Sequence, residues 1–123
     1  MTKDWKSVET HHIQEWRRIT EAVFNQDLVT INSSQCPVCA DSTVRYFIHR
    51  HGNTNRGGGW VWCPACYSFE HFSGLVPDWW KNLDLVSLNK LTAPPYWLEE
   101  HWELIYPQIL ANMSSPKNQH CGG

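Results

Sequence analysis

The sequence has no long apolar run and almost no imbalance of charge. Ten of its 123 residues are Lys or Arg and twelve are Asp or Glu, so the formal net charge is only -2. No stretch approaches the roughly 20 apolar residues of a membrane span, and residues 1–6 contain no apolar segment of the secretory kind. We therefore expect a cytoplasmic protein with no membrane contact and no global attraction to phosphate backbones.

The short motifs that carry common enzyme chemistry are also missing. The sequence has no His-Glu-x-x-His, no nucleophile elbow and no Gly-rich loop that leads into a helix. The three glycines at 57–59 precede an expected strand and are typical of a hairpin loop. Glu99, Glu100 and Glu103 are typical of the solvated face of a helix. We expect that the protein is not an enzyme.

Cysteine is scarce, but its spacing is specific. Four of the five cysteines form two Cys-Pro-x-Cys pairs, Cys36 with Cys39 and Cys63 with Cys66. A Cys-x-x-Cys turn holds two thiolates on one side of a tetrahedral site, so two turns supply the four ligands of a structural zinc ion. In the cytoplasm, paired cysteines hold metal more often than they form disulfides. We predict one structural Zn²⁺ on these four residues and expect the fifth, Cys121, to be a free exposed thiol.

The segment 36–74 resembles the zinc-ribbon family, in which two Cys-Pro-x-Cys turns, called knuckles, are joined by a β-hairpin. The resemblance covers about a third of the chain and implies a hairpin, often with a third strand, around one closed metal site. Family knuckles usually have Gly after the second cysteine, where this chain has Ala40 and Tyr67. The segment also looks like rubredoxins, whose four cysteines hold iron. A redox dithiol would need a βαβ context, which the sequence lacks.

Hydrophobic periodicity predicts an α+β fold with a single domain over residues 1–113. Apolar residues at steps of three and four predict an N-terminal helix over 4–25. The ribbon segment, 36–74, is rich in β-branched and aromatic residues and predicts a small antiparallel hairpin with a third strand. Its strands are expected at 43–49, 59–63 and 68–73. The short segment 27–32 fits a strand and a turn of helix equally well.

Prolines mark the expected helices of the C-terminal part, 77–113. Pro77 opens one helix, and the two prolines at 94–95 open a second, because proline is favoured in the first helical turn. Pro107 is expected to end or kink the second helix, since it cannot donate a backbone hydrogen bond. Residues 114–123 are polar and predict a disordered tail.

Tryptophan is abundant, with eight residues in a chain of this size. Large apolar side chains fill the core of a small domain, and tryptophan also serves protein interfaces. We expect most to be buried and one of the adjacent pair Trp79 and Trp80 to be exposed. Together with the slight acidity and the missing catalytic motifs, this favours a module that binds another protein. The preferred contact patch comprises Trp97, Glu99, Glu100, Trp102 and Glu103.

Two classes of partner are consistent with the sequence. Small acidic proteins of this kind include bacterial immunity proteins and antitoxins that neutralise basic nuclease toxins, so a toxin is one candidate by analogy. The alternative is nucleic-acid binding in transcription or a related process, the commonest use of zinc ribbons. Its supporting residues are Arg45, His49, Arg50, His51 and Arg56, with Trp60 for base stacking. The sequence decides neither between these partners nor on the oligomeric state.

Overall fold

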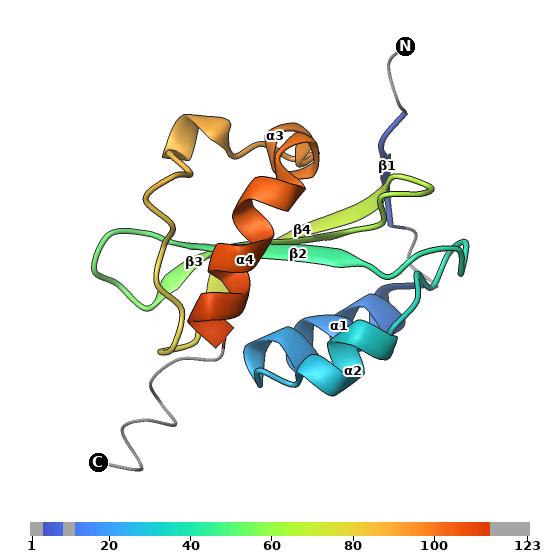
Figure 1. The fold of residues 1–123 in the computed structure, drawn as a ribbon, viewed down its shortest axis with the longest axis horizontal. Coiled ribbons are helices and arrows are strands. Elements are labelled where there is room, and N and C mark those ends of the chain that lie inside the picture. The colour runs from blue at the N-terminus through green and yellow to red at the C-terminus, as the bar shows by residue number, and fades with distance from the viewer. Residues whose placement is uncertain (1–3, 9–11, 114–123) are drawn as a thin grey trace.

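The computed structural model describes residues 4–8 and 12–113. These residues form a four-stranded mixed sheet with helices on both of its faces, which confirms the expected α+β class (Figure 1). The strands are β1 (Lys6–Ser7), β2 (Arg45–Arg50), β3 (Arg56–Trp62) and β4 (Ser68–Leu75). The helices are α1 (Ile13–Phe24), α2 (Leu28–Ser33), α3 (Tyr96–Glu100), α4 (Trp102–Met113) and the 3-10 turn η2 (Leu88–Lys90). The predicted tail, 114–123, lies outside the described residues.

The sheet has the order β1-β4-β3-β2. β2, β3 and β4 are antiparallel neighbours, so the expected hairpin and third strand are both present. The glycines at 57–59 belong to β3 rather than to a loop. A Cβ atom at Gly57 would collide with the backbone oxygen of His49, and one at Gly59 would collide with the ring of Phe72. Glycine is therefore needed in this strand because its neighbours approach the backbone closely.

The predicted N-terminal helix over 4–25 is wrong in its first part, because α1 begins only at Ile13. Before it, β1 pairs in parallel with β4, and Lys6 donates a 2.9 Å backbone hydrogen bond to Tyr67. The ring of Trp5 lies edge-on to that of Tyr67, with centroids 4.9 Å apart. These contacts with a distant strand outweigh the local helical periodicity. The ambiguous segment 27–32 lies in α2, whose N-terminus is capped by Asp27.

The helix predicted to open at Pro77 is also wrong. Between β4 and α3 the chain is irregular apart from η2. The guanidinium of Arg50 donates to the backbone oxygens of Pro77 at 2.7 Å and Trp80 at 2.8 Å, which fixes a turn there. The side chain of Asn82 pairs with both backbone groups of Arg50, at 2.7 and 2.8 Å. This segment is held by the edge of β2 instead of by its own helical bonds.

The final helical region is interrupted at His101 and not at Pro107. The His101 Nδ1 atom lies 2.9 Å from the Trp97 backbone oxygen, and its ring stacks on Trp97 with centroids 4.0 Å apart. α4 then continues through Pro107 to Met113. The proline is exposed, and the carbonyl group that it leaves unpaired is that of exposed Glu103, which water can reach.

The sheet lies between two helical layers. In Figure 1, α1 and α2 lie below the sheet, α3 lies above it, and α4 runs between these layers across β2. Both ends of α4 contact Tyr46 of β2, through the ring of Trp102 and the Sδ atom of Met113. The longest of these helices have 12 residues, and none of the helices described here has the length and apolarity to cross a membrane.

The tryptophans are mostly in the core, as expected. Five are buried: Trp16, Trp60, Trp62, Trp80 and Trp102. The other three, Trp5, Trp79 and Trp97, are half-buried. Of the adjacent pair, Trp80 is 1% exposed, while Trp79 donates its indole N–H to the Phe24 backbone oxygen at 2.8 Å. Neither forms the exposed anchor that the sequence suggests.

Candidate metal centre

The two cysteine pairs lie at one end of the ribbon. Cys36 and Cys39 are in the turn between α2 and β2, and Cys63 and Cys66 are in the turn between β3 and β4. The Sγ atoms of Cys36 and Cys66 are 3.7 Å apart, those of Cys39 and Cys63 are 3.6 Å apart, and all four lie within 4.8 Å of one another. Zn–S bonds of about 2.3 Å in a tetrahedron place the sulfurs about 3.8 Å apart. The cluster therefore fits a single structural zinc ion.

Both turns direct backbone N–H groups at a sulfur. The Val38 N–H donates to Cys36 Sγ at 3.2 Å, and the Ala65 N–H donates to Cys63 Sγ at 3.3 Å. The N–H groups of the second cysteines reach the same sulfurs, at 3.5 and 3.4 Å. Donors around a thiolate stabilise its charge, so the backbone favours the deprotonated form that binds metal.

The residues after each pair take the backbone conformation in which the family usually has glycine. Ala40 has φ 58° and Tyr67 has φ 62°. Their N–H groups close the turns by donating to the backbone oxygens of Cys36 at 2.9 Å and Cys63 at 3.0 Å. The knuckle geometry thus forms without glycine, at the steric cost of a Cβ atom in a left-handed conformation.

We expect Ala40→Gly to stabilise the zinc-loaded protein by about 1 kcal/mol, because glycine adopts positive φ without that cost. Ala40 is exposed, so little packing is lost. Chemical denaturation monitored by tryptophan fluorescence measures the change. Ala65→Gly, at an exposed position of the other turn, is the control and is expected to give no gain. A loss of stability in Ala40→Gly would contradict the geometry of this turn.

The sulfurs differ in their surroundings. Burial raises the pKa of the Cys36 and Cys63 thiols. Burial also acts to raise the pKa of Cys66, but hydrogen bonding by Ser68 and by the neighbouring thiols outweighs it and lowers this pKa to about 7. The Ser68 hydroxyl is 3.2 Å from Cys66 Sγ and is the buried polar side chain beside the site. Ser68 was missed in the sequence, where its only signal is its place two residues after Cys66.

Some residues of the predicted protein-binding patch pack within the protein, and others are exposed. Glu99 Oε1 accepts hydrogen bonds from Arg45 Nη1 and from Trp62 Nε1, both at 2.8 Å. Trp102 is 8% exposed, and its ring contacts that of Trp62 at 5.5 Å. These two members of the patch therefore stabilise the fold. Trp97 is half-buried, whereas Glu100 and Glu103 are exposed.

Half of the predicted nucleic-acid-binding cluster likewise makes contacts within the protein. Arg45 is paired with Glu99, and Arg50 binds backbone oxygens of the irregular segment. Trp60 is 5% exposed and stacks on His71, with ring centroids 4.5 Å apart. His49 is half-buried, and burial and the nearby His51 lower its pKa. Of the six residues, only His51 and Arg56 are exposed.

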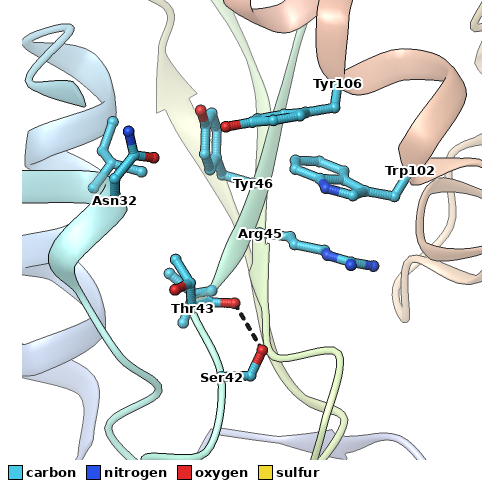
Figure 2. A pocket seen from close by; sticks show the side chains of 9 residues that line it. Asn32, Ser42, Thr43, Arg45, Tyr46, Trp102 and Tyr106 are labelled. Carbon is cyan, nitrogen blue, oxygen red and sulfur yellow. Dashed lines mark hydrogen bonds between the residues drawn. The ribbon is translucent and has the colours of Figure 1, made fainter. Parts of the chain in front are cut away.

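Two surface pockets flank the Arg45 and Trp102 side chains. One, of about 330 Å³, lies between α2, β2 and α4, with Asn32, Tyr46 and Tyr106 on its walls (Figure 2). The other, of about 410 Å³, is formed by α3 and the start of α4. Its lining residues are Arg45, Glu99, Glu100, His101, Trp102, Glu103 and Leu104. Tyr106 was not predicted from the sequence to line a pocket, because helical periodicity does not show which side chains surround a cavity.

Comparisons with known proteins assign neither a family nor a function to the chain. No family model, no curated protein and no solved structure matches the chain. Metal binding is therefore assigned from the positions of the four sulfurs, and the zinc-ribbon resemblance rests on the two knuckles.

Proposed function

We propose that the protein is a non-catalytic, zinc-stabilised module that binds a basic partner protein through the surface of α3 and the start of α4. The observation that carries this proposal is the position of Glu100, Glu103 and Leu104. All three are exposed, and all three line the 410 Å³ pocket. The pocket combines an apolar contact with two carboxylates whose charges are open to a partner.

This surface has the composition of a binding site. Leu104 is 53% exposed and Tyr96, at the start of α3, is 52% exposed. Large apolar side chains near the centre of an interface supply most of its affinity, and charged groups at the rim speed the encounter. The acidic rim selects for a basic partner, since no exposed cation of the pocket balances Glu100 and Glu103.

The metal centre supports this surface from beneath. Cys63 directly follows Trp62, whose indole N–H donates to Glu99 in α3. A zinc ion on the four cysteines fixes the ends of β2 and β3, and these strands hold Arg45 and Trp62 against Glu99. The role of the metal is therefore to keep α3 in place. Four thiolates complete the shell of a structural zinc site and leave no position for a substrate.

A basic nuclease toxin is the kind of partner that this surface suits, with the chain acting as its immunity protein or antitoxin in the cytoplasm. The exposed carboxylates would occupy part of the cationic surface with which a nuclease holds phosphates. Nucleic-acid binding is less well supported, because Arg45 and Arg50 are engaged within the fold.

The test is capture of partners from the native host with the tagged, zinc-loaded chain. The double variant Glu100→Lys/Glu103→Lys is expected to weaken binding of the captured protein about tenfold or more and to reverse its salt dependence. Glu21→Lys/Asp84→Lys makes the same charge change at exposed positions elsewhere and is the control. Equal binding by both double variants, or capture of nucleic acid alone, would refute the proposal.

A further inference from the structure

The pocket of about 330 Å³ between α2, β2 and α4 has no part in the proposed function. Its walls come from segments that are distant in the sequence (Figure 2). Its floor consists of core side chains, none of them more than 8% exposed: Ile31, Val44, Tyr46 and Trp102. A concave site of roughly 300 Å³ or more between packed elements is the usual setting for a small ligand.

Aromatic rings form one wall of this pocket. The Trp102 ring lies edge-on to those of Trp62 and Tyr46, with centroids 5.5 and 5.9 Å away. Tyr106 stacks on Trp102 with centroids 5.0 Å apart. The Tyr46 hydroxyl donates to Met113 Sδ at 3.4 Å, which fixes that ring as well. Because contacts outside the pocket hold these rings, the wall is preformed and favours an aromatic ligand.

Three polar side chains at the rim have unused hydrogen-bonding capacity. Asn32 and Thr43 are exposed, and Tyr106 is half-buried. Within the part of the chain that the structure describes, the Asn32 carboxamide and the hydroxyls of Thr43 and Tyr106 form no hydrogen bond. Ser42 differs, because its hydroxyl donates to the Thr43 backbone oxygen at 3.3 Å. The Asn32 carboxamide presents a donor beside an acceptor, which matches a ligand edge that carries the complementary pair.

The pocket offers no unpaired charge. Arg45 is the one charged residue among its described lining residues, and its guanidinium is paired with Glu99 at 2.8 Å. The Arg45 Cζ atom lies 5.3 Å from the centre of the Trp102 ring, and Figure 2 shows this side chain directed away from Asn32. A charged ligand would lose its hydration here without gaining a counter-ion, so the pocket suits a neutral molecule.

We propose that this pocket binds a small, neutral heteroaromatic molecule whose ring edge carries a hydrogen-bond donor beside an acceptor. This is the chemistry of an amino-substituted purine or pyrimidine base. The ring covers the apolar floor, and its edge pairs with the carboxamide of Asn32. The ligand is a free base or a nucleoside, because a nucleic-acid strand also brings phosphates, which are bound by free cations.

This inference does not rest on the proposed function. The pocket shares Arg45 and Trp102 with the partner-binding surface, but neither Glu100 nor Glu103 lines it. The double variant Glu100→Lys/Glu103→Lys is therefore expected to bind the small ligand like the wild type while it loses affinity for the partner protein. The failure of one proposal can thus be distinguished from the failure of the other.

The experiment is a titration of the zinc-loaded full chain with adenosine and with cytidine, followed by two-dimensional NMR. Because each ligand is small and the site is open on one side, the expected dissociation constant is on the order of 1 mM. Saturable shifts are expected at the side-chain amide of Asn32, at the indole N–H of Trp102 and at the backbone amides of 43–46. No saturable shift with either nucleoside up to about 10 mM, or shifts confined to another surface, would overturn the proposal.

The neutrality of the ligand has its own test. Adenosine monophosphate is expected to bind within about twofold of adenosine, because the pocket holds no free cation for the phosphate. A monophosphate that binds about tenfold more tightly than adenosine would show that an anion is recognised, and it would refute the proposal.

Asn32→Ala is the matched variant, because it removes the carboxamide and leaves the floor of the pocket intact. It is expected to weaken the binding of adenosine about fivefold. Purine riboside, which lacks only the 6-amino group of adenosine, is expected to bind the wild type about fivefold more weakly than adenosine and to bind both proteins nearly alike. Gln108→Ala, which removes a carboxamide at an exposed position outside the pocket, is the control. Equal binding of adenosine and purine riboside by the wild type would refute the assigned contact.

Discussion

Replacing Cys63 by serine is expected to remove the zinc and most of the folding stability. Cys63 is fully buried, and its Sγ atom accepts two backbone N–H groups of its own turn. Structural zinc contributes about 10–16 kcal/mol of apparent binding free energy in small domains. This exceeds or equals the roughly 5–15 kcal/mol by which a whole domain is stable. The variant is therefore expected to lose the ordered ribbon, measured as loss of near-ultraviolet dichroism and of the thermal transition.

Native mass spectrometry gives the complementary measurement, one zinc per wild-type chain and none in Cys63→Ser. Cys121→Ser replaces the fifth cysteine, which is not among the four predicted ligands, and is expected to retain both zinc and stability. A strong chelator is expected to reproduce the effect of Cys63→Ser, and more readily at low pH, because protons compete with the metal for buried thiols whose pKa is raised. A Cys63→Ser protein that melts like the wild type would show that the cluster does not hold a structural metal.

The metal centre was predictable because the cysteine spacing is a local signal and because two independent features of the sequence predict the same geometry. The spacing of Cys36 and Cys39, and of Cys63 and Cys66, fixes each half of the ligand set. The β-rich segment between the pairs independently predicts the hairpin that brings the halves together. Only the turn conformation at Ala40 and Tyr67 was in question, and the structure shows the positive φ that family knuckles have.

The elements that were wrongly predicted depend on residues far away in the sequence. Trp5 belongs to a helical pattern, yet it packs on Tyr67 and places β1 in the sheet. Pro77 begins what resembles a helix, yet its carbonyl group accepts from Arg50. A periodicity measures only how well an isolated segment suits a helix, and these tertiary contacts are invisible to it.

The contact surfaces were only partly predictable, for a similar reason. Glu99 and Glu100 are adjacent and chemically identical in sequence, but successive helical residues point about 100° apart. Glu99 is turned toward Arg45 and Trp62, and Glu100 is turned toward solvent. Which of two carboxylates meets a partner is decided by the packing of α3 on the sheet.

Glu99→Ala is the second substitution with a large expected effect. It is expected to lower the free energy of unfolding by about 3 kcal/mol. The substitution leaves Trp62 Nε1, on a fully buried side chain, without an acceptor, and it leaves the guanidinium of Arg45 without its counter-ion. For a domain of this size the melting temperature falls by about 10 °C. Thermal denaturation of the zinc-loaded protein measures the change, and zinc content is expected to be unaffected.

Glu100→Ala is the control, and its stability is expected to lie within about 0.5 kcal/mol of the wild type because that carboxylate is exposed. Glu99→Gln retains one acceptor oxygen but not the charge, so its loss is expected to fall between those of the two alanine variants. The proposed function requires the opposite order for binding, with substitutions of Glu100 weakening the partner complex. If Glu99→Ala were as mild as Glu100→Ala, the ion pair would not be what holds α3 to the sheet.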